Sequence, residues 1–352
     1  MKYDKKILIC YNEPTRYYNN YLGKDDIEYD QQNDLSEREF LKQIDNIRSI
    51  LLKRFTYVET LAVNRNIKNA INQLINFNPD AIFNFVESIE GNTNLEVYFA
   101  GLYDLLGFEY TGNTPITLGN CLVKSRTKQI LESFRIKTPK HFTCELNYIP
   151  SRSELKLKYP LILKLLREDA SIGISEFSVV RTYKQLVERL KYLYNSFNQE
   201  VLIEEYIDGR ELNVAILGNK ILPISEISFD TLPENLPKII TYEAKWSEES
   251  VYFKNTIPKC PTNLDTKVEE KVREVALKAY EALECRDYAR VDIRLNKKNI
   301  PYVIEVNPNP DISPDTGFVR SAKAANINYE QLLYTIISFA IERSNYDTQA
   351  AI

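Results

Sequence analysis

The chain is poor in the residues that carry most nucleophilic and zinc chemistry. It holds one histidine, His141, among 352 residues. Without a second histidine we expect neither a hydrolase triad nor a histidine-rich metal site, and we interpret His141 as structural. Five cysteines, an odd number, include no CxxC pair. This pattern predicts neither a disulfide framework nor a zinc site, and it favours a reducing, cytoplasmic location.

The sequence also lacks a strong positive charge and a long apolar run. Its net charge is -4, so we expect no nucleic-acid partner. No stretch is long and apolar enough for a membrane span, and the N-terminus, MKYDKKILICYN, has no signal-peptide pattern. With 44% hydrophobic residues, the chain can bury a large core in two or three domains.

The most informative stretch lies near the C-terminal end, where the alternating runs YARVDIRL and PYVIEVN flank the polar turn LNKKNI. This arrangement predicts a β-hairpin. Alternation places Arg290, Asp292 and Arg294 on one face of the first strand. In the second strand it aligns Val303, Glu305 and Asn307.

Asp292, Glu305 and Asn307 can therefore converge on one point. Carboxylate and amide oxygens suit Mg²⁺ when water and phosphates fill its other positions. The alternative is a hairpin with a merely solvated polar face. The following NPNPD favours the metal site, because two prolines force a rigid turn beside these ligands.

Residues 1–113 alternate short apolar strands with amphipathic helices, which predicts βαβ units and a parallel sheet. Ligands of such sheets gather beyond the C-terminal strand ends. Glu13 and Glu87 are candidates for this reason, with solvated loop acids as the alternative. The cluster of Gly, Pro and Thr in YTGNTPITLGN predicts a connection to the next domain.

Residues 114–200 form a predicted central domain. One helix, CLVKSRTKQILESF, carries Lys124 and Lys128, which could simply increase solubility. Lys164 lies inside an apolar strand, where an ammonium group needs an anionic partner. The loop REDASIGIS, with Ser171 and Gly173, could bring backbone N–H groups to a phosphate, or could be an ordinary hairpin loop.

Residues 201–345 form the last predicted domain, followed by a tail at 346–352. The run EVLIEEYIDGRELNVAILGNKILPISEI predicts an antiparallel meander of three strands. Glu204, Glu205 and Glu211 could bind a nucleotide's amino and hydroxyl groups or remain sheet-face acids. A long polar stretch around Trp246 predicts a loop that acts as a lid, although Trp246 could equally be a packing residue.

Taken together, LGFEYTG, VLIEEYIDGRELNVAILG, YEAKW, ARVDIRL and VIEVNPNP resemble motifs of the ATP-grasp superfamily, within its D-alanine:D-alanine ligase branch. The resemblance covers roughly residues 105–333. It implies an ATP-grasp fold of mixed α/β and α+β class, with an N-terminal parallel α/β domain, a small central domain and a C-terminal antiparallel-sheet domain. It also favours a homodimer.

The resemblance assigns roles residue by residue. It implies that ATP is bound by Lys124, Lys164, Ser171, Gly173, Glu204, Glu205, Ile207, Glu211 and Lys245. It implies Mg²⁺ at Asp292, Glu305 and Asn307, with two ions that Mn²⁺ could replace. The catalytic pair would be Lys245 with Arg290, which would stabilise the tetrahedral oxyanion. The substrates would meet Glu13, Glu87, Trp246, Asp315, Thr316 and Gly317.

The sequence departs from the family where substrates bind. The family's serine and lid tyrosine fall at Ala170 and Trp246, its serine-leucine pair falls at Thr316 and Gly317, and Glu13 is only a positional substitute for its glutamate. We therefore expect an ATP-dependent carboxylate-amine ligase, acting through an acyl phosphate on small molecules other than two D-alanines. The alternatives are a true D-alanine:D-alanine ligase and a catalytically idle ATP-binding regulator.

Overall fold

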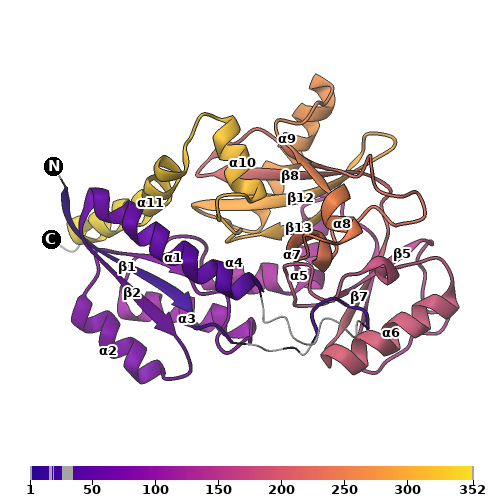
Figure 1. Cartoon of the computed structure of the whole chain (residues 1–352), viewed down its shortest axis with the longest axis horizontal. Helices are drawn as coiled ribbons and strands as arrows, with labels where there is room; N and C mark the ends of the chain where they lie inside the picture. The colour runs from indigo at the N-terminus through magenta and orange to yellow at the C-terminus, as the bar shows by residue number, and fades with distance from the viewer. Residues whose placement is uncertain (1, 16–17, 19, 26–34, 351–352) are drawn as a thin grey trace.

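The computed structural model describes residues 2–15, 18, 20–25 and 35–350, without the side chains of 35–40 and 345–350. Three sheets organise the chain (Figure 1). None of the helices within the described residues is long and apolar enough to cross a membrane.

The first sheet is parallel, as the alternation of strands and helices predicts. Its order is β2-β1-β3, formed by β1 (Tyr3–Asn12), β2 (Phe55–Val63) and β3 (Ala81–Phe85). The connecting helices are α1 (Leu35–Arg54) and α2 (Ile67–Phe77), and α3 (Asn94–Leu106) follows β3. Successive residues of β1 enter different cores, with Ile7 packing beside α1 and α11 (Tyr329–Ala350) and Leu8 beside α2 and α3.

The second sheet is antiparallel and has the order β4-β7-β5-β6. Its strands are β4 (His141–Cys144), β5 (Leu161–Leu165), β6 (Val179–Val180), which follows the short helix η2 (Glu176–Ser178), and β7 (Val201–Glu205). Helix α6 (Tyr183–Phe197) buries Leu186, Leu190 and Leu193 against it. The sheet therefore includes residues beyond position 200.

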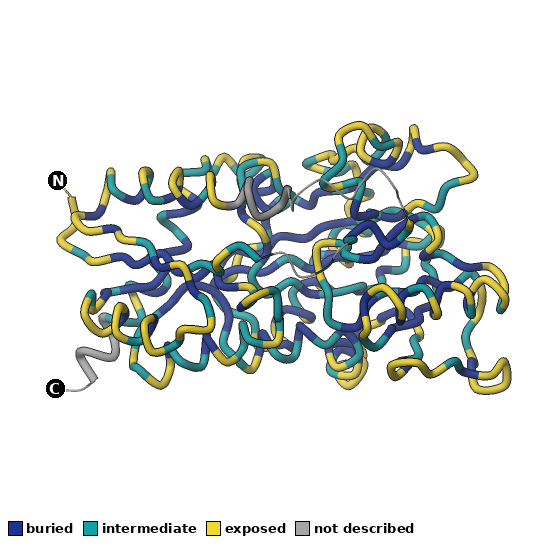
Figure 2. Tube along the Cα trace, turned by 60° about the horizontal axis from the view of Figure 1, so that its bottom comes forward, coloured by how far each residue is buried: buried dark blue, intermediate teal, exposed yellow. Residues whose placement is uncertain are grey.

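The third sheet has the order β11-β10-β8-β12-β13, and β9 pairs with β8. Its strands are β8 (Gly209–Leu217), β9 (Lys220–Ile221), β10 (Ser225–Ser228), β11 (Ile257–Lys259), β12 (Tyr288–Asn296) and β13 (Pro301–Asn307). Helix α9 (Thr266–Ala282) covers one face. Helix α10 (Gly317–Ala324) and α11 join the other face to the first sheet in one continuous core. Buried segments, dark blue in Figure 2, run through the interior of the molecule.

Two expectations about local structure differ from what is observed. The predicted meander does not exist as one unit, because β7 pairs in the second sheet whereas β8 pairs in the third. The expected connection at YTGNTPITLGN contains a helix, α4 (Pro115–Leu122), and α5 (Lys124–Ser133) starts after an extended Val123. Proline at the first turn and the Thr114 cap explain why α4 forms there.

The predicted long loop and polar tail also contain helices. The stretch around Trp246 forms α7 (Tyr242–Trp246) and α8 (Val251–Asn255), which begin at the side-chain caps Thr241 and Ser250. Helix α11 continues to Ala350, through most of the expected tail, whose last residues, 351–352, lie outside the described residues.

Candidate active site

The hairpin of β12 and β13 brings the expected metal ligands together. Asp292 lies opposite Glu305, and Arg290 opposite Asn307. The Asn307 amide nitrogen donates to Asp292 Oδ2 at 3.0 Å. Arg290 donates from Nε and Nη2 to the two Asp292 oxygens, at 2.8 Å each. The convergence of Asp292, Glu305 and Asn307 that alternation predicts is confirmed.

The alternation fails one step earlier on β13. A register shift leaves Ile304 as an extra residue, because Asp292 pairs with Glu305 whereas Ile293 pairs with Val303. Val303 therefore enters the hydrophobic core with Val306 and does not share the face of Glu305, as the sequence pattern had suggested. The bulge separates the core-filling part of the strand from its polar end.

Opposing charges set the electrostatics of this carboxylate pair. Burial and the charge of Glu305 raise the pKa of Asp292, against the stabilising effect of Arg290. Burial would also raise the pKa of Glu305, but Lys124, Lys164 and further cations lower it to about 2. Glu305 is thus ionised at neutral pH in a field of positive charge.

These side chains fit a divalent cation that also binds ligand oxygens. Two carboxylates and an amide converge, and the described residues hold no group of three or more His, Cys, Asp and Glu side chains suited to a metal. A cation here would therefore take further oxygens from water and substrate, as Mg²⁺ does with phosphates.

The lysines of α5 are buried, so the interpretation of Lys124 and Lys128 as solubilising groups is wrong. Lys124 Nζ donates to Asp169 Oδ1 at 2.9 Å and to the Glu168 carbonyl at 2.6 Å. Lys128, 1% exposed, donates to Thr138 Oγ1 at 2.7 Å and forms an ion pair with Glu204. Figure 1 shows α5 between the two antiparallel sheets.

Glu204 and Glu205 lie on opposite faces of β7, as neighbours on a strand must. Glu204 is buried, and Lys164 on β5 lies 3.0 Å from its Oε2. Burial raises the pKa of Glu204, but Lys128 and Lys164 outweigh this effect and hold it at about 2. Glu205 instead accepts from the Lys158 backbone N–H at 3.0 Å, so the two side chains have different partners in the protein.

Ile207 and Glu211 lie beyond β7, where the chain crosses between sheets. Ile207 is half-buried. Glu211, near the start of β8, faces Arg294 across the sheet, with 3.4 Å between Oε2 and Nη2. Burial raises the pKa of Glu211, whereas Arg294 lowers it.

The loop 167–175 has a constrained backbone. Ala170, Ser171 and Gly173 have φ values of 52°, 62° and 71°, a left-handed conformation that is unfavourable for the two residues with side chains. The Gly173 N–H donates to the Tyr21 carbonyl at 2.9 Å. The structure therefore gives this N–H a partner within the protein, where the sequence suggested a phosphate.

Helix α7 carries Lys245 and Trp246. The Lys245 side chain reaches solvent, yet partial desolvation and the charge of Arg290 lower its pKa. Trp246 packs near Tyr242, with 6.3 Å between ring centroids, and its buried Nε1 has no hydrogen-bond partner among the described residues. The structure therefore gives Trp246 a packing role.

Acidic groups from the first sheet extend to the same region. Glu87 follows β3 and its side chain reaches solvent, yet partial desolvation together with Asp311 and Asp169 raises its pKa to about 8. Desolvation, Glu87 and Asp169 also raise the pKa of Glu96 on α3. Glu13 makes a different contact, accepting from Asn64 Nδ2 at 2.7 Å.

Residues 313–316, which precede α10, lie next to the hairpin. Thr316 Oγ1 donates to the Ser313 carbonyl at 2.9 Å, and the Asp315 carbonyl accepts from Arg320. A side chain at Gly317 would come within 3.6 Å of Asn213 Oδ1. Asn213 in turn donates to Asp292 at 2.7 Å, which places Gly317 close to the carboxylate pair.

Several residues of this site were not identified from the sequence: Lys128, Asn213, Glu96, Asp169 and Asp311. Asp311 was inside the NPNPD motif, and Asp169 inside the REDASIGIS loop, so their positions could have suggested them. Glu96 and Asn213 had no sequence signal, because their neighbours come from distant strands and helices.

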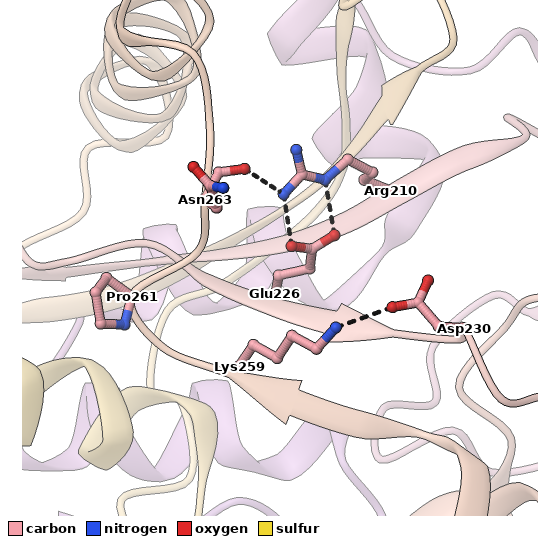
Figure 3. A pocket seen from close by; sticks show the side chains of 6 residues that line it. All are labelled: Arg210, Glu226, Asp230, Lys259, Pro261 and Asn263. Atoms are coloured by element: carbon pink, nitrogen blue, oxygen red, sulfur yellow. Dashed lines mark hydrogen bonds and ion pairs between the residues drawn. The ribbon is translucent and has the colours of Figure 1, made fainter.

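A hollow of about 440 Å³ lies elsewhere, at the β8, β10 and β11 edge of the third sheet (Figure 3). Its charged groups are paired with one another. Arg210 donates to both Glu226 oxygens at 2.7 and 2.6 Å, and Lys259 lies 2.9 Å from Asp230. These pairs join strands and loops of the sheet, and they leave the hollow without a charge directed at a ligand.

The fold and this site define an ATP-grasp protein. Residues 131–338 match the family described as D-ala D-ala ligase C-terminus. The chain belongs to this family and is an ATP-grasp ligase of the class that forms carbon–nitrogen bonds.

Curated relatives extend beyond the matched family region. An uncharacterized protein of Sinorhizobium fredii, y4sG, is 31% identical over 74% of this chain and 75% of its own length. A D-alanine--D-alanine ligase of Carboxydothermus hydrogenoformans is 30% identical over 87% of this chain and 95% of its own. The crystal structure of D-alanine--D-alanine ligase from Bacillus anthracis complexed with ATP has the same fold, with a TM-score of 0.72 at 23% identity, over 97% of this chain and 99% of that one.

Proposed function

We propose that this protein is an ATP-dependent ligase that joins a carboxylate to an amine through an acyl phosphate, releasing ADP and phosphate. The observation that carries the proposal is the convergence of Asp292, Glu305 and Asn307 beside Arg290. Two carboxylates surrounded by positive charge suit a magnesium nucleotide, whose phosphates need cations and whose metal needs oxygens. The relatives named as ligases and the neighbour complexed with ATP support this choice.

The cationic groups would act on the nucleotide phosphates. Lys124, Lys164 and Lys245 come from α5, β5 and α7, so they approach from different elements. Asp292, Glu305 and Asn307 would hold Mg²⁺, which would neutralise the negative charge on the γ-phosphoryl group during its transfer. Whether one or two ions bind, and whether Mn²⁺ replaces them, are parts of the same proposal that titration can answer.

Arg290 is suited to stabilise the oxyanion that forms when the amine attacks the acyl phosphate. Its guanidinium is fixed by two hydrogen bonds to Asp292. Burial lowers the pKa of Arg290, but Asp292 and Glu305 raise it further, so the group stays charged. A fixed positive charge needs no reorganisation during the reaction.

We further propose that the substrates are amino-acid-like molecules other than two D-alanines. Where the family has a serine, Ala170 has no hydroxyl, and where the family has a lid tyrosine, Trp246 places a larger ring on α7. Glu13, the positional substitute for the family's glutamate, accepts a hydrogen bond from Asn64. Besides desolvation, Asp311 raises the pKa of Glu87, and Glu87 raises the pKa of Glu96. A cationic amine beside these acids would favour their ionised forms, which supports an amine substrate. The names of the curated relatives favour D-alanine:D-alanine ligation as the second candidate.

ADP release with Mg-ATP across D- and L-amino acids, β-alanine and aryl acids, with product masses read in parallel, tests both candidates. We expect ADP and an amide mass with a pair other than two D-alanines. A D-alanyl-D-alanine mass with D-alanine alone would replace our choice with the second candidate. ATP binding without ADP for any pair would point to the idle regulator.

The variant Ala170→Ser/Trp246→Tyr restores the two family side chains. If pocket shape sets specificity, we expect D-alanine-dependent ADP release to rise by about tenfold, which corresponds to about 1.4 kcal/mol of differential binding. Trp246→Phe serves as a control, because it reduces the ring without adding a hydroxyl. An equal rise in both variants would show that ring size alone, and not the restored hydroxyls, decides the outcome.

A further inference from the structure

Residues 18 and 20–25, which we call the docking segment, follow β1 but contact the second sheet and α7. The Tyr18 hydroxyl donates to Glu168 Oε1 at 2.8 Å and accepts from Gln199 Nε2 at 2.7 Å. Glu168 begins the stretch that carries Asp169 and Ala170. The docking segment thus joins the first domain to the loop beside Lys124.

Two glycines meet where the docking segment crosses the loop 167–175. A Cβ atom on Gly23 would lie 2.3 Å from the Gly173 carbonyl carbon and oxygen, and Gly23 has φ +73°. Arg189 on α6 donates to both glycine carbonyls, and Ser175 Oγ donates to the Gly23 carbonyl at 3.0 Å. Neither backbone can move away without losing these bonds, so the contact is specific.

The same segment holds α7. Tyr21 stacks on Tyr242 with 5.8 Å between centroids and 20° between planes. Lys24 Nζ lies 2.8 Å from Glu243 Oε2 and 3.3 Å from Glu176 Oε1, with 20% of its side chain exposed. Although burial lowers the pKa of Lys24, Glu243 and Glu176 raise it above its ordinary value.

Helix α7 needs such support, because it has only five residues. A helix of that length is unstable alone, since nucleation fixes several dihedral angles for few hydrogen bonds. Tyr242 and Glu243, the residues that contact the docking segment, precede Lys245 within the same turn and a half. Whatever fixes these two residues also fixes the direction of Lys245.

We propose that Tyr21 and Lys24 are positioning residues that hold α7, and with it Lys245, over the carboxylate pair of the hairpin. The role of Lys245 rests on the proposed ligase function, whereas the attachment of α7 does not. The docking segment follows Glu13, in a part of the chain where the sequence departs from the family. Glu13 itself accepts a hydrogen bond from Asn64 in the first domain.

Hydrogen exchange of the ligand-free, full-length protein tests the attachment. In Lys24→Met we expect the amides of residues 242–255 to exchange roughly fivefold faster, as loss of one partly buried ion pair predicts. Lys24→Arg should restore most of the protection, and Tyr21→Leu should act like Lys24→Met. Lys5→Met is the matched control, because it breaks a 2.9 Å pair with Asp80 in the first domain.

Wild-type exchange rates in both Lys24→Met and Tyr21→Leu would overturn the proposal. So would an equal acceleration by Lys5→Met, since the effect would then be general. These outcomes are independent of any reaction, so failure of the ligase function leaves the exchange result interpretable.

Coupling of ATP use to amide formation tests the consequence for the site. If α7 excludes water from the acyl phosphate, Lys24→Met should release severalfold more ADP per amide, because water replaces the amine as nucleophile and regenerates the acid. A structural defect alone would lower both products together. An unchanged ratio in Lys24→Met, with faster exchange of α7, would overturn the positioning of Lys245 while leaving the attachment of α7 established.

Discussion

The two halves of the site are built in different ways. The hairpin half comes from residues close in sequence, since Arg290, Asp292, Glu305 and Asn307 lie on paired strands. The α7 half combines the docking segment, the loop 167–175 and α7, which lie far apart in the chain. The first half sits on a continuous sheet, and the second depends on a few contacts between small elements.

This difference predicts different responses to change. Strands β12 and β8 pair over nine positions, from Tyr288 to Asn296, so the hairpin is backed by a long ladder. Helix α7 has five residues and is held largely by side chains. Conservative substitutions in the hairpin should therefore abolish activity without unfolding the protein. Substitutions around α7 should first change the position of α7.

Removing a ligand from the hairpin should have the largest effect on activity. Glu305→Gln keeps the shape of the side chain and removes its charge, so we expect ADP formation to fall by about 10³-fold or more. Circular dichroism and thermal unfolding should show a retained fold.

Glu226→Gln is the matched control, because Glu226 is a glutamate on the same sheet that pairs with Arg210 away from the proposed metal site. Full activity in Glu305→Gln would remove the carboxylate pair from the proposed mechanism.

The same contrast explains what the sequence could predict. Alternation along β12 and β13 is a local signal, and it is sufficient to place Asp292, Glu305 and Asn307 on one face of the hairpin. It missed the bulge at Ile304, because a bulge depends on pairing and packing and not on the polarity of one residue. It also missed that β7 and β8 enter different sheets, since both have the pattern of strands with a short link.

The α7 half was hardly predictable for a physical reason. The contacts of its docking segment with the loop 167–175 and α7 join residues separated by more than 140 positions, as Tyr18 and Glu168 show with a separation of 150. No periodicity records such a contact. The polarity of the stretch around Trp246 suggested a loop, whereas side-chain caps at Thr241 and Ser250 start two short helices.

Lys128 lies between the hairpin half and the α7 half of the site, and we expect its substitution to have the largest effect on stability. It is buried with Glu204 and also donates to the Ile304 carbonyl at 3.3 Å, so it joins α5, β7 and the bulge of β13. Lys128→Met should lower the free energy of unfolding by about 3 kcal/mol, because Glu204 would keep only Lys164 as a cationic partner. Urea unfolding measures this value, and a loss below about 1 kcal/mol would contradict the structural role.

Glu87, at the edge of the site, should respond to pH in the opposite direction from Glu305 of the hairpin, whose pKa is lowered. The pKa of Glu87 is raised from 4.5 to about 8, so the folded state binds this proton more tightly than the unfolded state. Stability should therefore be fully present below about pH 4.5 and should fall as pH rises towards 8. The change should stay below about 1 kcal/mol, because the exposed Glu87 side chain is screened by solvent.

Unfolding of wild type and Glu87→Gln between pH 5 and pH 8 tests this effect. The variant should show a flatter dependence of stability on pH. Equal slopes would mean that Glu87 titrates normally and that its neighbours Asp311 and Asp169 do not influence it.

The smallest effect should come from Arg210, whose pair with Glu226 resembles that of Arg290 with Asp292. Both arginines bind a carboxylate through two nitrogens. The Arg210 side chain, however, is 37% exposed, against 18% for Arg290. Arg210→Met should therefore cost below about 1 kcal/mol of stability and leave ADP formation unchanged, because solvent screens the exposed arginine and Glu226 still accepts from Thr262 Oγ1 at 2.6 Å. Thermal unfolding and ADP release measured on one preparation separate the two properties.

A clear loss of turnover would contradict this prediction. It would mean that the hollow of Figure 3 is coupled to the active site through β8, and that similar arginine pairs on this sheet do not act independently.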